Sequence, residues 1–127
     1  SFVPYDAWLS MIGADGLNSQ RNMFDRLVHF TFGLLAVVPF VELTTRYGQL
    51  RCGQAVIGSL LFVLAIGGLY EIFEWGLTLA LSPEQAGAYN GEQGDRFDSQ
   101  KDMAIAALGA LLAIPAGVRF ARHGVAQ

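Results

Sequence analysis

Six ionisable side chains stand out in this sequence because they occur in pairs at helical spacing, within segments that are otherwise apolar. The pairs are Asp25 with His29, Glu71 with Glu74, and Asp98 with Asp102. Residues three or four positions apart lie on the same face of a helix, so each pair presents its two side chains together. Carboxylates with an imidazole are ligands for a divalent cation such as Zn, Mn, Fe or Mg. The alternative is an ion-paired, water-filled pocket in which Arg26, Arg96 and Lys101 neutralise the acids.

The composition around these pairs indicates a membrane protein. The 127 residues are 53% hydrophobic and 15% charged, whereas an ordinary soluble domain is about 25% charged. The formal net charge of -3 argues against a polyanionic partner, so we expect the lipid bilayer and no nucleic acid as a partner. The single cysteine, Cys52, excludes a disulfide within this chain and a cysteine-based zinc or iron–sulfur site.

Three segments approach the length of a membrane span, because a bilayer core of about 30 Å requires roughly 20 mostly apolar residues in a helix. They cover residues 24–43, 55–81 and 102–118. We expect residues 98–102 to add a polar first turn to the third segment. A short loop at 44–54, which includes Cys52, and a longer polar loop at 82–101 connect the segments. The sequence therefore predicts an all-α polytopic membrane protein with three transmembrane helices in up-down-up order.

The beginning of the chain forms a separate segment in this prediction. Residues 1–22 are too short and too polar to span a bilayer, and we expect an interfacial or loop segment in which Tyr5 and Trp8 suit the headgroup region. Residues 23–127 then form a three-helix membrane domain, which we expect to be the C-terminal part of a longer protein. The denser basic charge of the 44–54 loop and the tail favours a cytoplasmic position for both.

The alternating direction of the spans brings the six ionisable residues to one membrane face. The first pair starts the first span, the second pair lies late in the second span, and the third pair starts the third span. We therefore expect one shared pocket. Its members are His29, Glu71, Glu74 and Asp102, with Asp25 and Asp98 beside them. Ionisable groups inside a membrane cost about 2.5–3.5 kcal/mol each on insertion scales, so such a cluster indicates ion pairing, hydration or a bound ion.

Small residues continue the same helix faces below the cluster. Gly33 follows His29 by one turn, and Gly67 precedes Glu71 by one turn. On the third span, the small residues after Asp102 are Ala106, Gly109, Ala113 and Ala116. Small residues let helix backbones approach closely in lipid, so we expect the three spans to pack tightly here.

Motifs of well-known enzyme classes are missing from the sequence. There is no HExxH or Glu-x-x-His spacing, serine-hydrolase elbow, phosphate loop or dinucleotide fingerprint. The acids at 95–102 do not follow the spacing of an EF-hand. We expect Asp98 or Ser99 to cap the third helix instead, where the helix dipole favours an acid. We place Glu42 at the opposite membrane face, paired with Arg46 four residues later.

Four longer motifs occur in a fixed order along the chain. They are VPYDAW at 3–8, QRNMFDRLVHF at 20–30, YEIFEW at 70–75 and QGDRFDSQKDM at 93–103. Together they resemble a bacterial inner-membrane family of unknown function that includes YjdF. The resemblance implies further apolar segments before the first motif. It also adds Asp95 to the acidic residues that match the family. It implies no established substrate. Glu92 stands where the family pattern has a small hydroxyl residue, so we leave Glu92 out of the site.

Two functional classes remain open from the sequence, and whether the protein is an enzyme remains open with them. The first is an integral membrane protein with a polar, divalent-metal-binding site at one membrane face, which hydrolyses or transfers a lipid-linked or amphiphilic substrate through a metal-bound water. The second is an accessory or assembly subunit of a larger membrane complex, with other membrane subunits as partners and an ion-paired structural cluster. A transporter is a weaker third class, because three helices rarely enclose a pathway without oligomerisation.

Overall fold

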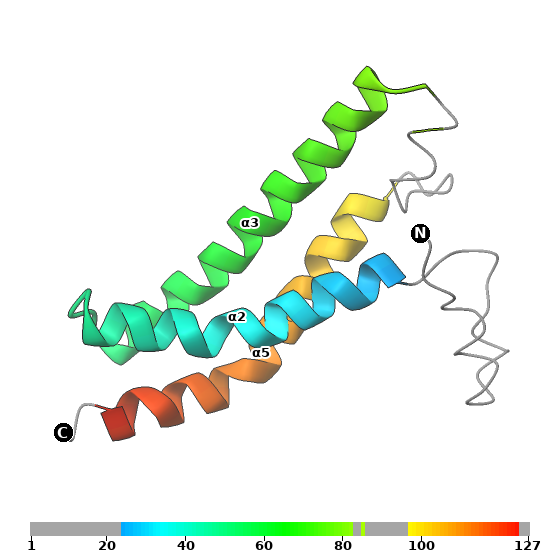
Figure 1. The fold of residues 1–127 in the computed structure, drawn as a ribbon. Helices are drawn as coiled ribbons and strands as arrows, with labels where there is room; N and C mark the ends of the chain where they lie inside the picture. Colours follow the sequence, from blue (N-terminus) through cyan, green and yellow to red (C-terminus); the bar gives the residue numbers. More distant parts are fainter. Residues whose placement is uncertain (1–23, 83–84, 86–96, 125–127) are drawn as a thin grey trace, which may run out of the picture.

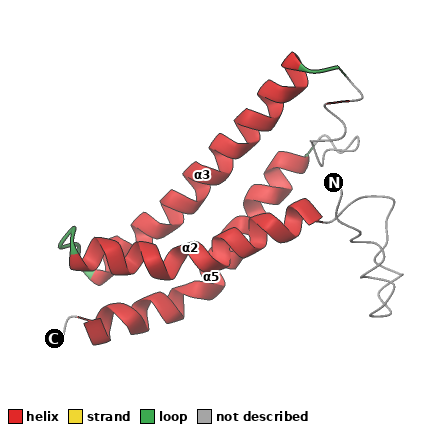
Figure 2. Ribbon diagram, in the orientation of Figure 1, coloured by secondary structure: helices red, strands yellow, loops and turns green. Residues whose placement is uncertain are grey.

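The computed structural model describes residues 24–82, 85 and 97–124, and the segment expected at 1–22 lies outside them. Three helices make up nearly all of the described residues, and each is long and apolar enough to cross a membrane. They are α2 (Phe24–Arg46), α3 (Cys52–Ala80) and α5 (Asp98–Gly124). Figures 1 and 2 show these helices running in alternating directions, without a strand in the part of the chain that is described. The predicted all-α, up-down-up arrangement of three spans is confirmed.

The first span, α2, is longer than predicted and ends at Arg46 instead of residue 43. The polar side chains of Thr44 and Thr45 suggest a loop, but their hydroxyls donate hydrogen bonds to carbonyls four residues earlier, at 2.8 and 2.7 Å. These bonds satisfy both hydroxyls within the helix, so the helix can continue. The predicted pair near this end is present, with Arg46 Nη1 3.3 Å from Glu42 Oε1.

The connection between α2 and α3 is correspondingly shorter than predicted and covers residues 47–51. Gln49 has a φ of 52°, in the left-handed region that non-glycine residues adopt mainly in tight turns. The predicted loop position of Cys52 is wrong, since this residue is the first of α3. The backbone N–H of Arg51 donates to Gln54 Oε1 at 3.1 Å, as in a capping box, and this bond allows α3 to begin there.

The last span, α5, extends beyond the predicted segment at both ends. It begins at Asp98, so the expected polar first turn is present. It continues past Pro115 to Gly124, whereas the prediction ended it near residue 118. A proline removes one backbone hydrogen bond and bends a helix without having to end it. Figure 1 shows α5 changing direction in its orange section.

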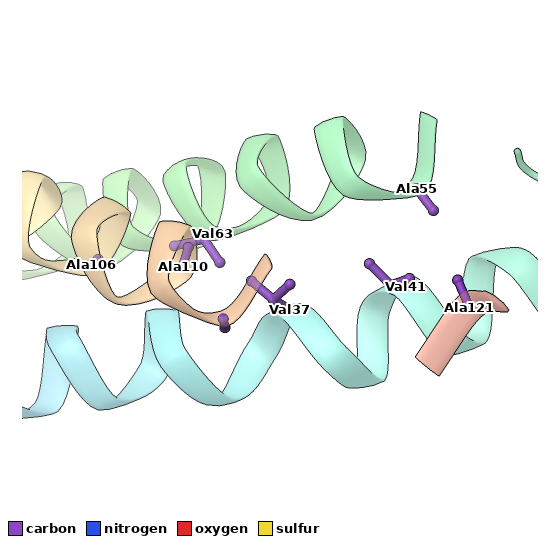
Figure 3. Close-up of a cluster of buried hydrophobic side chains, with 8 residues drawn as sticks. Val37, Val41, Ala55, Val63, Ala106, Ala110 and Ala121 are labelled. Atoms are coloured by element: carbon purple, nitrogen blue, oxygen red, sulfur yellow. The ribbon is translucent and has the colours of Figure 1, made fainter. Parts of the chain in front are cut away.

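Small side chains form the core where the three helices meet (Figure 3). In the part of the chain that the structure describes, the buried apolar residues are all valine or alanine, namely Val37, Val41, Ala55, Val63, Ala106, Ala110, Ala113 and Ala121. Large apolar side chains such as Leu35, Ile57 and Leu69 are exposed instead. This distribution suits a bilayer, in which lipid tails are as apolar as leucine and close packing of small residues holds helices together.

The closest packing joins α2 to α5. Gly33 on α2 faces the carbonyl oxygen of Ala106, and Gly109 on α5 faces the carbonyl oxygen of Phe30. A Cβ atom at either glycine would overlap that oxygen, so both positions require glycine at this helix separation. The two glycines therefore set the distance between the first and last spans.

The small-residue face of α5 differs from the prediction at its far end. Ala106, Gly109 and Ala113 are buried as expected, but Ala116 is exposed. Gly117 is buried instead, because the buried face continues from Ala113 by one full turn and not by three residues.

The expected close approach at Gly67 on α3 is not observed. Gly67 is buried, but a Cβ atom at this position would meet no atom of the described residues within 4 Å. Figure 1 shows the reason, since α3 lies near α2 at their short connection and diverges from it toward the opposite end. Within the described residues, Gly67 therefore borders open space.

Candidate functional site

The polar cluster lies at one end of the bundle, where α2 and α5 begin and α3 approaches its end. Asp25 occupies the first turn of α2 and Asp98 the first turn of α5, where a helix dipole stabilises a carboxylate. His29, Asp98 and Asp102 are buried, with exposed fractions of 4%, 7% and 1%. Ionisable groups this deeply buried require partners in a membrane.

Arg26 forms one half of the cluster with the two acids of α5. Its Nη2 atom lies 3.7 Å from Asp98 Oδ1, and its Nε atom lies 3.6 Å from Asp102 Oδ1. The guanidinium therefore compensates negative charge that has little access to water. Of the other two basic residues considered for this role, Lys101 is exposed and Arg96 lies outside the described residues.

His29 forms the other half with one acid from its own helix and one from α3. Its Nε2 atom lies 3.3 Å from Glu71 Oε1 and 3.8 Å from Asp25 Oδ1. Both His29 Nε2 and Glu71 Oε1 are buried, and neither has a hydrogen-bond partner within the described part of the chain. The imidazole also packs edge-on against Tyr70, with 5.4 Å between the ring centroids.

Glu74 lies one turn beyond Glu71, nearer the end of α3. Its carboxylate lies near the Tyr70 hydroxyl and interacts electrostatically with Asp25 and Asp102. Its neighbour Glu71 lies near the Ser99 hydroxyl. Acidic groups from all three helices thus lie near one another, as the alternating topology requires.

The distances between candidate ligand atoms differ between the two halves of the cluster. Two ligand atoms about 2.1 Å from a zinc-like ion are about 3.0–3.4 Å apart at octahedral or tetrahedral angles. The 3.3 Å between His29 and Glu71 matches this separation. One oxygen from each of Asp25, Asp98 and Asp102 lies within 4.8 Å of the others, whereas no third His, Cys, Asp or Glu of the described residues comes as close to both His29 and Glu71. Either half would therefore have to tighten to enclose an ion.

Two side chains that contact the cluster have no clear signal in the sequence. The sequence favours Tyr70 as an interfacial anchor or packing residue, and it offers Ser99 only as a possible helix cap. The indication that the sequence gives of a role in the site is that Tyr70 directly precedes Glu71 and that Ser99 directly follows Asp98. Asp95, which the family resemblance adds, lies outside the described residues.

Three apolar helices of spanning length, with small residues at their contacts and a buried polar cluster at one end, define a polytopic helical membrane protein. The chain belongs to the family described as predicted membrane protein DUF2238, which matches residues 1–123. It is 37% identical over 106 residues to the inner membrane protein YjdF of Escherichia coli K12, an alignment that covers 82% of this chain. The chain spans about half the length of that relative, since 50% of YjdF is covered. No solved structure matches the chain significantly.

Proposed function

We propose that this chain is part of a bacterial inner-membrane protein that binds a divalent cation through His29 and Glu71. The observation that carries the proposal is the 3.3 Å approach of His29 Nε2 to Glu71 Oε1, two buried atoms without a hydrogen-bond partner among the described residues. Buried polar atoms are normally satisfied, and one cation coordinated by both atoms would satisfy them together. The name of the Escherichia coli relative supports the inner membrane as the location.

The charge at this end of the bundle supports a cation. Five acidic side chains lie on the described ends of the three helices, against two basic side chains besides His29, those of Arg26 and Lys101. Like charges this close repel strongly in a medium of low dielectric constant. A divalent cation beside His29 and Glu71 would reduce this repulsion, with Asp25 and Glu74 as its further ligands.

The donor types narrow the choice of metal. A histidine nitrogen among carboxylate oxygens suits Zn, Mn or Fe, whereas Mg prefers oxygen ligands and retains most of its water. Asp98 and Asp102 remain candidate ligands in this proposal, although Arg26 already lies beside both. We therefore assign the cation to the half of the cluster that contains His29.

A second candidate function is that of a subunit in a larger membrane assembly, with the cluster as a structural ion-paired element. The position of Arg26 between Asp98 and Asp102 favours this alternative. So does the outer face of α3, where Leu69 and Phe73 are exposed. Under this alternative, mild solubilisation should yield a complex with other membrane proteins, and the purified protein should contain no stoichiometric metal.

Elemental analysis of the purified full-length protein tests the metal proposal. After dialysis against Zn, Mn, Fe or Mg, the wild type should retain about one ion of the preferred metal per chain. Glu71→Gln and His29→Gln should each weaken retention by at least about tenfold, because even residues that only support metal ligands contribute that much to affinity.

Glu42→Gln is the matched control for this measurement. It removes a carboxylate from α2 at the opposite end of the bundle, where Glu42 pairs with Arg46. Its metal content should equal that of the wild type. A wild type without metal, or equal losses in all three variants, would contradict the proposal.

A further inference from the structure

An apolar pocket adjoins the polar cluster where α2 and α3 diverge. Its volume is about 180 Å³. Its lining residues are Val28, His29, Phe32, Ile66, Gly67 and Tyr70. His29 therefore borders both the pocket and the cluster. Val28, Ile66 and Tyr70 are partly exposed, so the pocket opens between the two helices toward the lipid-facing surface.

Gly67 accounts for the space inside this pocket. Gly33 and Gly109 lie directly against backbone carbonyls and close the gap between their helices. Gly67 is also buried, but a Cβ atom added there would meet no described atom within 4 Å. Membrane helices gain stability from close packing, so an open space at a buried glycine leaves room for a molecule other than the helices themselves.

The pocket continues into a groove on the bilayer-facing side of α2. This second hollow shares Val28 and Phe32 with the pocket and extends along Leu27, Thr31 and Leu35. Leu27, Thr31 and Leu35 are exposed. A hydrocarbon chain can therefore pass from the bilayer into the pocket sideways, without crossing water.

The order of residues along both helices matches the polarity of a membrane lipid. On α2, the charged Asp25 comes first, His29 follows one turn deeper, and the apolar Phe32 follows after that. On α3, which runs in the opposite direction, Glu74 lies nearest the membrane face and Gly67 deepest. A lipid with its headgroup at the cluster and its chain in the pocket would have the same orientation as the lipids of that leaflet.

We propose that this pocket holds one hydrocarbon chain of a phosphate-bearing bilayer lipid whose headgroup lies at His29 and Glu71. This inference rests on the proposed function, because phosphate is repelled by the acidic side chains unless a divalent cation lies between them. His29 and Glu71 would hold the cation from the side of the protein, and the cation would supply the positive charge that a phosphate group requires beside these acids. The ligand of the metal site would therefore be a phospholipid or another phosphate-linked lipid.

Photocrosslinking tests the occupant of the pocket. Full-length protein is loaded with its metal and placed in nanodiscs that contain phosphatidylglycerol with a diazirine midway along one acyl chain. After irradiation, mass spectrometry should find more adducts at Val28, Phe32 and Ile66 than at the exposed Leu69 and Leu108, which face the general lipid. Gly67→Leu fills the pocket and should reduce the pocket adducts to the level at those lipid-facing positions.

Gly76→Leu provides the matched control, because Gly76 lies on the same helix, is exposed, and has no described atom near an added Cβ. Its adduct pattern should equal that of the wild type. Both glycine variants should keep the metal content of the wild type, which separates loss of the chain from loss of the ion. Glu71→Gln should lower both the metal content and the pocket adducts.

Each contrary result identifies which inference fails. Pocket adducts that persist in Gly67→Leu, or that never exceed those at lipid-facing positions in metal-loaded protein, overturn the lipid proposal and leave metal binding intact. Equal pocket adducts with and without metal overturn the headgroup assignment. With a photoreactive amino acid in place of Val28 or Ile66, crosslinks to another segment of the full-length polypeptide would show that protein fills the pocket and would overturn the proposal. Failure of the elemental analysis to find metal overturns both inferences.

Discussion

Arg26 divides the ionisable residues of the cluster into two groups with different chemistry. Its guanidinium lies beside Asp98 and Asp102, and this leaves His29 facing Glu71 on the neighbouring helix. Because Arg26 belongs to α2 and both aspartates belong to α5, the same contacts also fasten the first span to the last. A residue next to Asp25 in the sequence thus compensates acids that are more than 70 positions away.

Replacing Arg26 should strongly destabilise the bundle. Arg26→Gln leaves Asp102, which is 1% exposed, without the guanidinium beside it. Removal of one partner from a buried ion pair costs about 3–5 kcal/mol, so we expect a loss of that order in the free energy of unfolding. Unfolding of the full-length protein in mixed micelles by increasing SDS, followed by circular dichroism, measures this loss. Asp102→Asn in the same background should restore part of it.

Arg46→Gln is the control for Arg26→Gln, because it breaks an ion pair on the same helix. Arg46 and Glu42 have side chains that are 49% and 33% exposed, so solvent screens their interaction. An exposed pair of this kind contributes about 0–1 kcal/mol. Similar losses for the two arginine variants would show that burial of the Arg26 pairs does not matter.

At the scale of the helices, two glycines control how closely the first and last spans approach. An alanine methyl at position 33 would collide with a backbone carbonyl of α5, which cannot rotate away as a side chain can. We expect Gly33→Ala and Gly109→Ala each to lower the free energy of unfolding by about 1–3 kcal/mol through overpacking. The SDS titration measures this change too.

Gly76→Ala should have the opposite effect. Gly76 is exposed within α3, so a methyl group there meets no described neighbour and improves helix propensity by up to about 1 kcal/mol. Destabilisation by Gly76→Ala comparable to that of Gly33→Ala would show that helix-packing contacts do not explain the glycine requirement.

The sequence predicts these helices well because span length and residue pairing are local properties. Three apolar runs and three pairs at helical spacing suffice to place six ionisable residues at one face. The helix ends are predicted less well, because the hydroxyls of Thr44 and Thr45 can form hydrogen bonds either in a loop or within a helix. Gly33 and Gly67 look equivalent in sequence, each one turn from an ionisable residue. Only the divergence of α3 decides that one packs tightly and the other borders a pocket.

The sequence also does not predict which basic side chain contacts which acidic side chain. Spacing offers Arg26, Arg96 and Lys101 as equal candidates to neutralise the acids. That Arg26 lies beside Asp98 and Asp102 while Lys101 is exposed depends on the rotation of α2 against α5, and that rotation follows from the glycine contacts deeper in the bundle. Tertiary packing therefore determines how the predicted site is divided into two halves.

At the scale of the whole molecule, three spans require the two connections to lie on opposite membrane faces. With Cys52 replaced by serine, single cysteines at Gln49 and Ser82 of the full-length protein should react with a membrane-impermeant maleimide from opposite sides. We expect the Gln49 position to be labelled from the cytoplasm and the Ser82 position from the other side. Labelling of both from the same side would contradict the three-span arrangement.

The close contact between α2 and α5 also has a consequence for how the protein is made. These two helices are separated along the chain by the whole of α3, so the ribosome must add about 50 residues after Arg46 before α5 begins. At about 5–20 residues per second, this interval lasts several seconds. During it, α2 is in the membrane with Arg26 and without the aspartates that later compensate it. Insertion factors or neighbouring helices that shield this arginine would therefore act on the nascent chain, before any site exists.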